Sequence, residues 1–327
     1  MESRRRNHYD VTNQICIADP RDVGNEVARL LSAHDPAFDR GALDEALLIF
    51  TRLHAGTLPG YAAADTPYHD AQHSLDCTLG TARLIDGHER GVPADQRLGP
   101  RRSLLGVLIA LFHDAGYVRR RGDRASNGAA YTSSHVQRSA EFLHKFLPTL
   151  GFQREARLAG RIVHFTGYEI PLDDIAVREP ADRALGFMIA SADLLVQTAD
   201  RCYLEKCRDF LFPEFEVAGL AGQPRKGAPE PLYPDRETLM RGTPEFNARL
   251  WKDRLDGYFG GIHRHLGTHF DGRYGPNHPY RACIEDNLAR IGEVIGRDRF
   301  DQLSLRPRAV DAAWMRRSLG LRERLAA

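Results

Sequence analysis

Hydrophobic positions recur along most of this chain with the spacing of α-helices. Apolar residues return every three or four positions, whereas alternating runs of β-branched residues, which would indicate strands, are nearly absent. The pattern therefore predicts an all-α fold. We expect the helices, to within about 2–4 residues at each end, at residues 21–33, 40–55, 67–87, 101–115, 133–147, 153–165, 181–200, 244–268 and 279–296.

Residues typical of helix ends and loops support several of these boundaries. Thr66-Pro67 suits a helix start with proline in the first turn. The Thr-Ser-Ser stretch at residues 132–134 offers N-caps to the helix that follows. The stretch 218–234 is rich in proline and glycine and predicts a surface loop or hinge.

The length of 327 residues allows two domains, but one large domain with additions fits as well. The helical pattern divides the chain into an N-terminal helical lead (1–65), a central core (66–212) and a C-terminal helical extension packed on the core (213–327). The last section could cover a site, mediate a homodimer or enlarge the core. The sequence leaves these alternatives open.

Composition limits the surroundings and partners of the protein. The formal net charge of +1 gives no global field that would attract nucleic acid or an anionic membrane. The longest apolar run, Leu104–Phe112, is too short to span a bilayer, and no apolar segment follows the charged N-terminus as in a secretory signal. The five cysteines form no C-x-x-C pair, so reduced thiols are expected. We therefore expect a cytoplasmic protein without membrane or nucleic-acid partners.

The dipeptide His113-Asp114 ends the apolar run SLLGVLIALF. Burying two ionisable side chains there costs free energy unless a partner compensates. The partial negative charge at a helix C-terminus also favours a cation. A bound metal ion would meet both conditions, and a hydrogen-bonded core pair is the alternative.

Four further histidines lie at positions suited to ligation or proton transfer. His69 and His73 are four residues apart, so on a helix they would share one face. His135 opens the next predicted helix, and His164 closes the one after it. An i, i+4 pair such as His69 and His73 is equally typical of a polar surface helix, and His135 or His164 alone is more typical of an ordinary half-buried histidine.

The last candidate ligand, Asp193, lies inside the apolar run ALGFMIASADLLVQTAD. A carboxylate in such surroundings needs a cation or hydrogen-bond donors. Asp200 lies seven residues further on roughly the same helical face and is the rival for this role. Imidazole and carboxylate ligands without thiolate suit Fe, Mn, Zn or Mg.

The joint order of these residues is similar to that of a known superfamily. The order resembles the H…HD…H…H…D motif in the binuclear branch of the HD-domain metal-dependent phosphohydrolases, and its six positions are His73, His113, Asp114, His135, His164 and Asp193. Separately, YHD-x-x-H at 68–73 is similar to the YHN-x-x-H motif of class I cyclic nucleotide phosphodiesterases, with Asp70 in place of Asn. The resemblance covers roughly residues 66–205 and implies an HD-domain catalytic core with additional N- and C-terminal helices.

The resemblance also implies a role for each residue. Asp114 matches the carboxylate that bridges two divalent metal ions, whose identity (Fe, Mn, Mg or Zn) stays open. His69 matches the donor that protonates the leaving oxygen, so His69 and Asp114 are the predicted catalytic residues. The other ligands divide into a first-metal set and a second-metal set: His73, His113 and Asp193, then His135 and His164.

These matches imply hydrolysis of a small-molecule phosphoester, with a cyclic nucleotide phosphodiesterase or related nucleotide phosphohydrolase as the leading hypothesis. Two metals about 3.5–4 Å apart activate water and polarise phosphoryl oxygens. Guanidinium groups suit phosphate oxygens, although a solvated basic loop is the alternative for the arginines that follow the HD dipeptide. The predicted substrate contacts are Arg119, Arg121, Arg124 and Tyr68.

Two other functions compete with hydrolysis. Some members of the same superfamily with this ligand order are mixed-valent di-iron oxygenases, and histidine and carboxylate ligands suit iron. A degenerate domain acting as a nucleotide sensor is the third hypothesis. Near the C-terminus, His265 and His269 share a helical face, but no carboxylate accompanies them at ligand spacing.

Overall fold

The computed structural model describes residues 5–224, 229–273 and 278–316. It confirms the all-α prediction, because within these ranges the chain forms helices, connecting loops and only isolated β-bridges. The α-helices in chain order are α1 (Pro20–Ser32), α2 (Gly41–Ala55), α3 (Ala71–Gly91), α4 (Gly99–Phe112), α5 (His135–Phe146), α6 (Ala156–Ile162), α7 (Pro180–Ala199), α8 (Tyr203–Lys206), α9 (Phe212–Ala218), α10 (Arg236–Arg241), α11 (Thr243–Arg249), α12 (His265–His269) and α13 (Pro279–Arg297).

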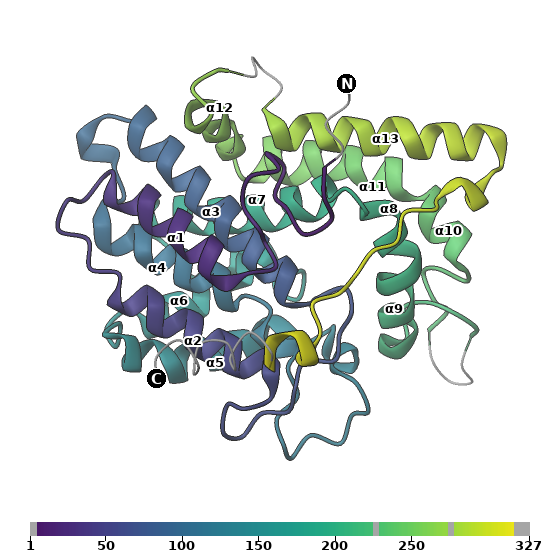
Figure 1. The fold of residues 1–327 in the computed structure, drawn as a ribbon, viewed down its shortest axis with the longest axis horizontal. Helices are drawn as coiled ribbons and strands as arrows, with labels where there is room; N and C mark the ends of the chain where they lie inside the picture. The colour runs from purple at the N-terminus through teal and green to yellow at the C-terminus, as the bar shows by residue number, and fades with distance from the viewer. Residues whose placement is uncertain (1–4, 225–228, 274–277, 317–327) are drawn as a thin grey trace.

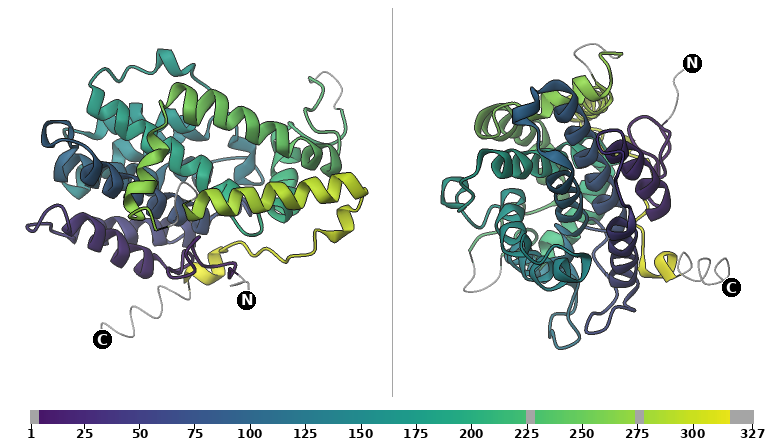
Figure 2. Two further views of the ribbon diagram at one scale, coloured as in Figure 1. Left: turned by 90° about the horizontal axis from the view of Figure 1, so that it is seen from above. Right: turned by 90° about the vertical axis from the view of Figure 1, so that its left-hand side faces the viewer.

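Helix α3 lies at the centre of the fold. It packs against α1, α4, α7 and α12, and nearly all of its side chains are buried. Small residues allow the close approach, since a Cβ atom at Gly87 would collide with the carbonyl oxygen of His265 in α12. Along the long axis of the molecule, α1 and α2 lie toward one end and α9 and α10 toward the other (Figures 1 and 2).

One large hydrophobic cluster joins the three predicted sections of the chain. Leu43 from the lead, Leu108 from the central core and Leu255 from the extension all belong to it. A smaller cluster includes Leu204 and Met240 and supports the helices at the α9–α10 end. The metal-ligand candidates on α3, α4 and α7 therefore stand on the better-packed part of the molecule.

Two helices differ from their predicted forms. The helix expected at 67–87 begins only at Ala71, because the side chain of Asp70 caps it by accepting a hydrogen bond from the His73 backbone N–H at 2.9 Å. The helix expected at 244–268 is interrupted, because Gly260 and Gly261 adopt left-handed backbone angles (φ of 60° and 74°). His69 thus precedes α3 and does not share a helical face with His73.

The sequence pattern also missed helices after α7. Residues 203–218 form a continuous helical run in which the π-helix Cys207–Leu211 joins α8 to α9. Helix α10 lies within a stretch that had no helix prediction. The boundary expected at residue 212 therefore falls inside a helical run.

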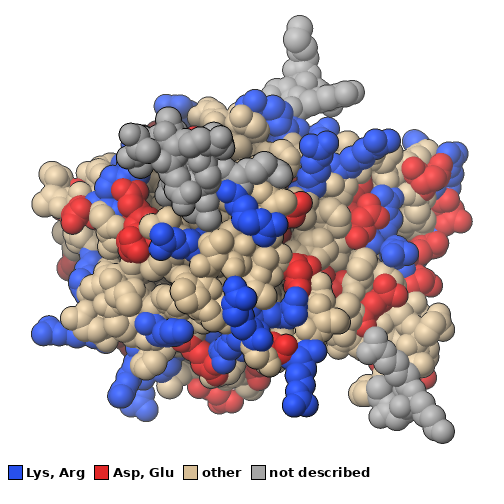
Figure 3. All heavy atoms as spheres, turned by 60° about the horizontal axis from the view of Figure 1, so that its bottom comes forward, with Lys and Arg blue, Asp and Glu red and all other residues tan. Residues whose placement is uncertain are grey.

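The chain after α13 returns across the molecule, as the yellow trace in Figure 1 shows. Its Val310 backbone N–H donates a 2.7 Å hydrogen bond to Asp70, so the far end of the chain supports the start of α3. In the described part of the chain, no helix is both long enough and apolar enough to cross a membrane. Basic and acidic side chains are interspersed on the face shown in Figure 3, in keeping with the net charge of +1.

Candidate metal centre

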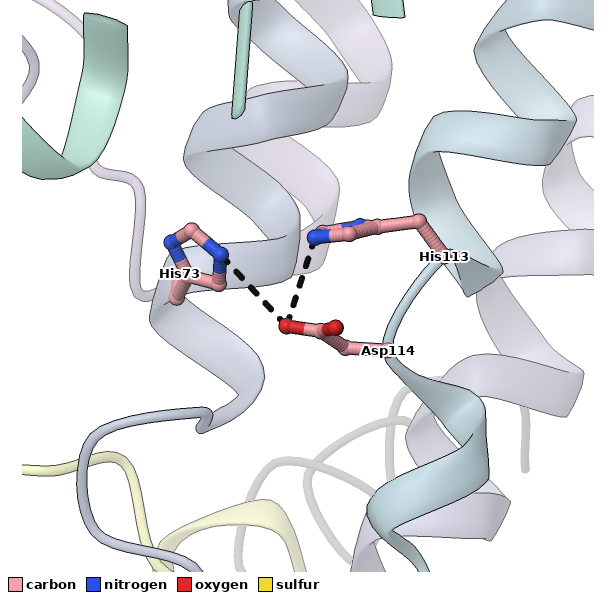
Figure 4. Close-up of side chains that lie close together, drawn as sticks. All are labelled: His73, His113 and Asp114. Carbon is pink, nitrogen blue, oxygen red and sulfur yellow. Dashed lines mark ion pairs between the residues drawn. The ribbon is translucent and has the colours of Figure 1, made fainter. Parts of the chain in front are cut away.

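Four predicted ligands converge from three helices; we call His73, His113, Asp114 and Asp193 the His–Asp cluster. His73 lies in the first turn of α3, His113-Asp114 follows α4, and Asp193 lies within α7. The His73 Nε2 atom is 3.1 Å from Asp193 Oδ1 and 3.4 Å from Asp114 Oδ2. The His113 Nε2 atom is 3.3 Å from Asp114 Oδ2 and 3.6 Å from Asp193 Oδ1. Figure 4 shows both imidazoles facing the Asp114 carboxylate.

A backbone contact sets the orientation of the His113 ring. Its Nδ1 atom lies 2.8 Å from the carbonyl oxygen of Ala110, which can only accept a hydrogen bond. The Nδ1 atom therefore carries a proton, and Nε2 is left facing the carboxylates. His113 Nε2 and Asp114 Oδ2 are buried, and neither makes a hydrogen bond with any described residue. A cation between them would satisfy both atoms.

The buried carboxylates of Asp114 and Asp193 need positive charge nearby to stay ionised. Burial alone raises the pKa of Asp114, but the neighbouring His113, His69 and His73 together outweigh it and hold the pKa well below its usual range. The pKa of Asp193 is lowered in the same way, because His113 and His73 together outweigh the effect of burial. Conversely, Asp114 raises the pKa of His113 despite burial. Two ionised carboxylates thus share the site with imidazoles, a donor set that suits a divalent metal.

His135 approaches the other oxygen of the Asp114 carboxylate. Its Nε2 atom is 3.7 Å from Asp114 Oδ1, whereas His73 and His113 face Oδ2. The His135 Nδ1 atom donates a 2.7 Å hydrogen bond to the carbonyl oxygen of Thr132, so this ring also presents Nε2 to the site. Burial lowers the pKa of His135 and favours the neutral form that ligates metals. Imidazoles therefore face both oxygens of the Asp114 carboxylate: His73 and His113 face Oδ2, and His135 faces Oδ1.

The sixth predicted ligand, His164, lies at a different cavity. It is buried in the 3₁₀ turn Val163–Thr166 and lines a groove of about 600 Å³ together with residues of α5 and α6. Its Nδ1 atom has no hydrogen-bond partner among the described residues. Burial lowers the pKa of His164, and nearby Glu169 opposes this effect. His164 is not among the residues that line the cavity beside the His–Asp cluster.

The His–Asp cluster opens onto a cavity of about 660 Å³, which we call the chamber. His73, Asp114 and Asp193 line it, together with His135. A second part of the wall comes from residues 203–224 and 229–246, which we call the cap segment. A cavity of this size suits a small-molecule ligand.

His69 lines the chamber and is held by a carboxylate that the sequence did not indicate. The His69 Nδ1 atom is 2.6 Å from Glu214 Oε2, and Glu214 is almost fully buried in α9. Burial lowers the pKa of His69, but the charge and hydrogen bond of Glu214, together with the charges of Asp114 and Asp193, outweigh burial, and the net effect is a raised pKa. The adjacent Asp70 caps α3. No local pattern marks Glu214, because it lies 145 residues further along the chain.

Two other residues at the site were also missed. Tyr117 stacks between the rings of His69 and His135, with ring centroids 4.3 Å apart on each side. Its place in LFHDAGY, three residues after Asp114, could have indicated this. Cys77 lies one helical turn after His73 and, with His113 and Asp193, forms a second group of potential ligand atoms within 4.8 Å of one another. Burial raises the pKa of the Cys77 thiol, which therefore favours its protonated form.

The predicted substrate contacts divide between the chamber and the surface. Tyr68 lines the chamber, whereas Arg119, Arg121 and Arg124 do not. Arg119 forms an ion pair with Asp65 at 2.9 Å, and Arg121 and Arg124 are exposed. These arginines thus pair with an acidic residue outside the chamber or face solvent.

Three other acidic residues pair with basic side chains. The rival ligand Asp200 pairs with Lys206 at 2.8 Å, whereas Asp193 faces the imidazoles of the cluster. Glu141, which lies on α5 with His135, pairs with Arg120. Asp86 does accompany His269, because its carboxylate accepts hydrogen bonds from His269 at 2.7 Å and from His34 at 2.8 Å. These last contacts link helices through hydrogen bonds.

Comparisons with models of protein families, with curated proteins and with solved structures gave no match for this chain.

Proposed function

We propose that this chain is a metal-dependent hydrolase of phosphoesters. The observation that carries the proposal is the convergence of ionised Asp114 and Asp193 with the imidazoles of His73 and His113, beside a chamber of ligand size. His69, paired with Glu214, lines the same chamber. Together these groups offer metal ligands and a proton donor on one cavity.

The ligands divide around Asp114. His73, His113 and Asp193 would hold one divalent ion with Asp114 Oδ2, and His135 would contribute to a second ion at Oδ1. A bound divalent metal would supply Lewis acidity and an activated water at neutral pH. The second ion depends on His135 and on further ligands, for which His164 remains a candidate.

His69 would act as the proton donor to the leaving alkoxide. Because its pKa is raised, the His69 imidazole stays protonated up to a higher pH than an ordinary histidine does. Glu214 fixes the ring by accepting from Nδ1, so Nε2 is the atom available to the leaving oxygen. Cyclic nucleotides, the substrates implied by the resemblance of residues 68–73, are the first esters to test.

A di-iron oxygenase is the second candidate. Imidazoles face both oxygens of Asp114, and this arrangement favours a di-iron oxygenase as much as it favours a hydrolase. The His69–Glu214 pair distinguishes the two functions, because oxygen activation has no alkoxide to protonate. Oxygen consumption by the iron-loaded protein, with no ester hydrolysis, would support the oxygenase.

The test begins with elemental analysis of the purified protein, in which we expect one or two equivalents of Fe, Mn or Zn. Hydrolysis of bis-p-nitrophenyl phosphate and of 3′,5′-cyclic nucleotides is then measured with Mn²⁺, Mg²⁺ or Fe²⁺ added. Turnover that disappears with a chelator and returns with metal supports the proposal. Absence of turnover with every metal and ester contradicts it.

A further inference from the structure

The chamber lining has two chemically different parts. The His–Asp cluster supplies polar ligand groups, and the cap segment contributes mainly apolar side chains, namely Leu211, Phe215, Leu220, Leu232, Leu239 and Phe246. Phe215 and Tyr233 stack with ring centroids 5.9 Å apart and nearly parallel planes, which presents a flat aromatic surface. The part of a ligand beside the cap segment would therefore contact apolar side chains rather than charged groups.

Charge on the chamber wall sharpens this contrast. Among the lining residues that the structure describes, none is Lys or Arg, and Glu169 is the acidic residue outside the His–Asp cluster. A further phosphate or carboxylate beside the cap segment would find no countercharge among the lining residues of that segment, and desolvating an unpaired charge is costly. The arginines expected to meet a charged substrate do not line the chamber.

The rim carries two unusually exposed hydrophobic residues. The side chains of Tyr168 and Leu232 are 67% and 70% exposed, and both line the chamber. Tyr168 is held by the guanidinium of Arg254, which lies 4.0 Å from its ring centroid. Exposed apolar side chains at the mouth of a cavity are typical of a site that covers an apolar ligand.

We propose that the chamber receives an uncharged, bulky apolar group, at least as large as an aromatic ring, on the phosphoester whose phosphoryl group lies at the His–Asp cluster. This inference rests on the proposed function and adds a substrate class to it. Monoesters and diesters with one large uncharged group fit, and nucleoside polyphosphates do not.

Binding of three phosphonates to the Mn²⁺-loaded protein tests the inference without requiring turnover. Methylphosphonate, phenylphosphonate and 4-carboxyphenylphosphonate share the metal-binding group and differ only in the group that would enter the chamber. We expect phenylphosphonate to bind about 10- to 100-fold more tightly than methylphosphonate in isothermal titration calorimetry. We expect the added carboxylate to weaken binding by about tenfold or more.

Variants of α9 locate the effect in the chamber. Phe215→Ala should reduce the preference for phenyl over methyl severalfold, and Phe215→Leu should give an intermediate ratio because it keeps volume but loses the flat ring. Val217→Ala is the matched control on the same helix, since Val217 is 40% exposed and does not line the chamber. Circular dichroism would verify that each variant is folded.

The outcomes separate the inference from the proposed function. If none of the three phosphonates binds the metal-loaded protein, the proposed function itself fails. If all three bind with equal affinity, or the carboxylate strengthens binding, the inference fails and the proposed function stands. A phenyl preference that survives Phe215→Ala and Phe215→Leu unchanged would also overturn the assignment to this wall.

Discussion

The two walls of the chamber differ in how firmly the fold supports them. The His–Asp cluster stands on α3, α4 and α7, whose side chains belong to the large hydrophobic cluster. The cap segment is built from short helices over the smaller cluster that includes Leu204 and Met240. The ligand set thus lies on rigid elements, while the groups that orient His69 and line the apolar part of the chamber lie on a less supported layer.

The difference teaches that the proposed chemistry and the proposed selectivity would be separable in this molecule. The His–Asp cluster is built from side chains on or directly after the central helices and includes no residue from the cap segment. The proposed proton donor is shared, because His69 precedes α3 but its orienting carboxylate, Glu214, comes from α9. Changes to one wall should therefore leave the property of the other wall measurable.

The largest effect is expected from Asp114→Asn, which removes the charge that faces imidazoles on both sides. We expect metal content to fall and hydrolysis to drop to the uncatalysed background. At a metal concentration about 100-fold above Kd, Mn²⁺ should stabilise the wild type by about 2.7 kcal/mol and the variant by much less. Elemental analysis and thermal unfolding measure both. Asp95→Asn, at an exposed site, is the control; a variant that kept its metal would contradict the assignment.

His69→Ala is expected to break the proton-transfer step alone. Turnover of esters with poor leaving groups should fall by about 10²- to 10⁴-fold, whereas p-nitrophenyl esters, whose leaving group needs no proton, should lose far less. Steady-state kinetics on the two ester types, with metal content measured in parallel, gives the comparison. Equal losses on both ester types would remove His69 from proton donation.

Native-state hydrogen exchange should distinguish the two walls directly. We expect the amides of α8 and α9 to exchange at least about tenfold faster than those of α3 and α7, because the smaller cluster buries less apolar surface. Mass spectrometry of peptic fragments from the metal-loaded protein would measure the rates. Equal protection of the two regions would show that the cap segment opens only with the whole fold.

Glu214→Gln should shift the pH dependence of hydrolysis without abolishing it. The Glu214 charge raises the pKa of His69, and a proton donor works only below its pKa. Activity is therefore retained at low pH and lost as pH rises through the His69 pKa. Neutralising Glu214 lowers that pKa, so the alkaline loss should begin at a lower pH in the kcat profile. A shift toward higher pH, or none, would contradict this role.

The smallest effect is expected from Arg121→Ala. This side chain is exposed and does not line the chamber, so hydrolysis should change by no more than about twofold. Assaying the singly charged ester bis-p-nitrophenyl phosphate gives the measurement. A tenfold loss would instead restore Arg121 as a substrate contact.

The sequence by itself determined the helical class and indicated the four residues of the His–Asp cluster, whose role as metal ligands stays a prediction. Periodicity indicates helices because it reflects local geometry, and Leu104–Phe112 proved to be buried on all sides, as its composition required. The burial cost of His113-Asp114 and Asp193 likewise follows from their immediate neighbours. Each of these inferences uses information contained within one helix.

Only the tertiary structure decided which residues meet across the fold. The partner of His69 lies 145 residues away, and the choice of Asp193 over Asp200 depends on Lys206, which engages Asp200. Of the arginines after the His-Asp dipeptide, Arg119 and Arg120 pair with acidic neighbours, and Arg121 and Arg124 are exposed. Side-chain pairing of this kind is set by the packing of whole helices against one another, and no local pattern in the chain records that packing.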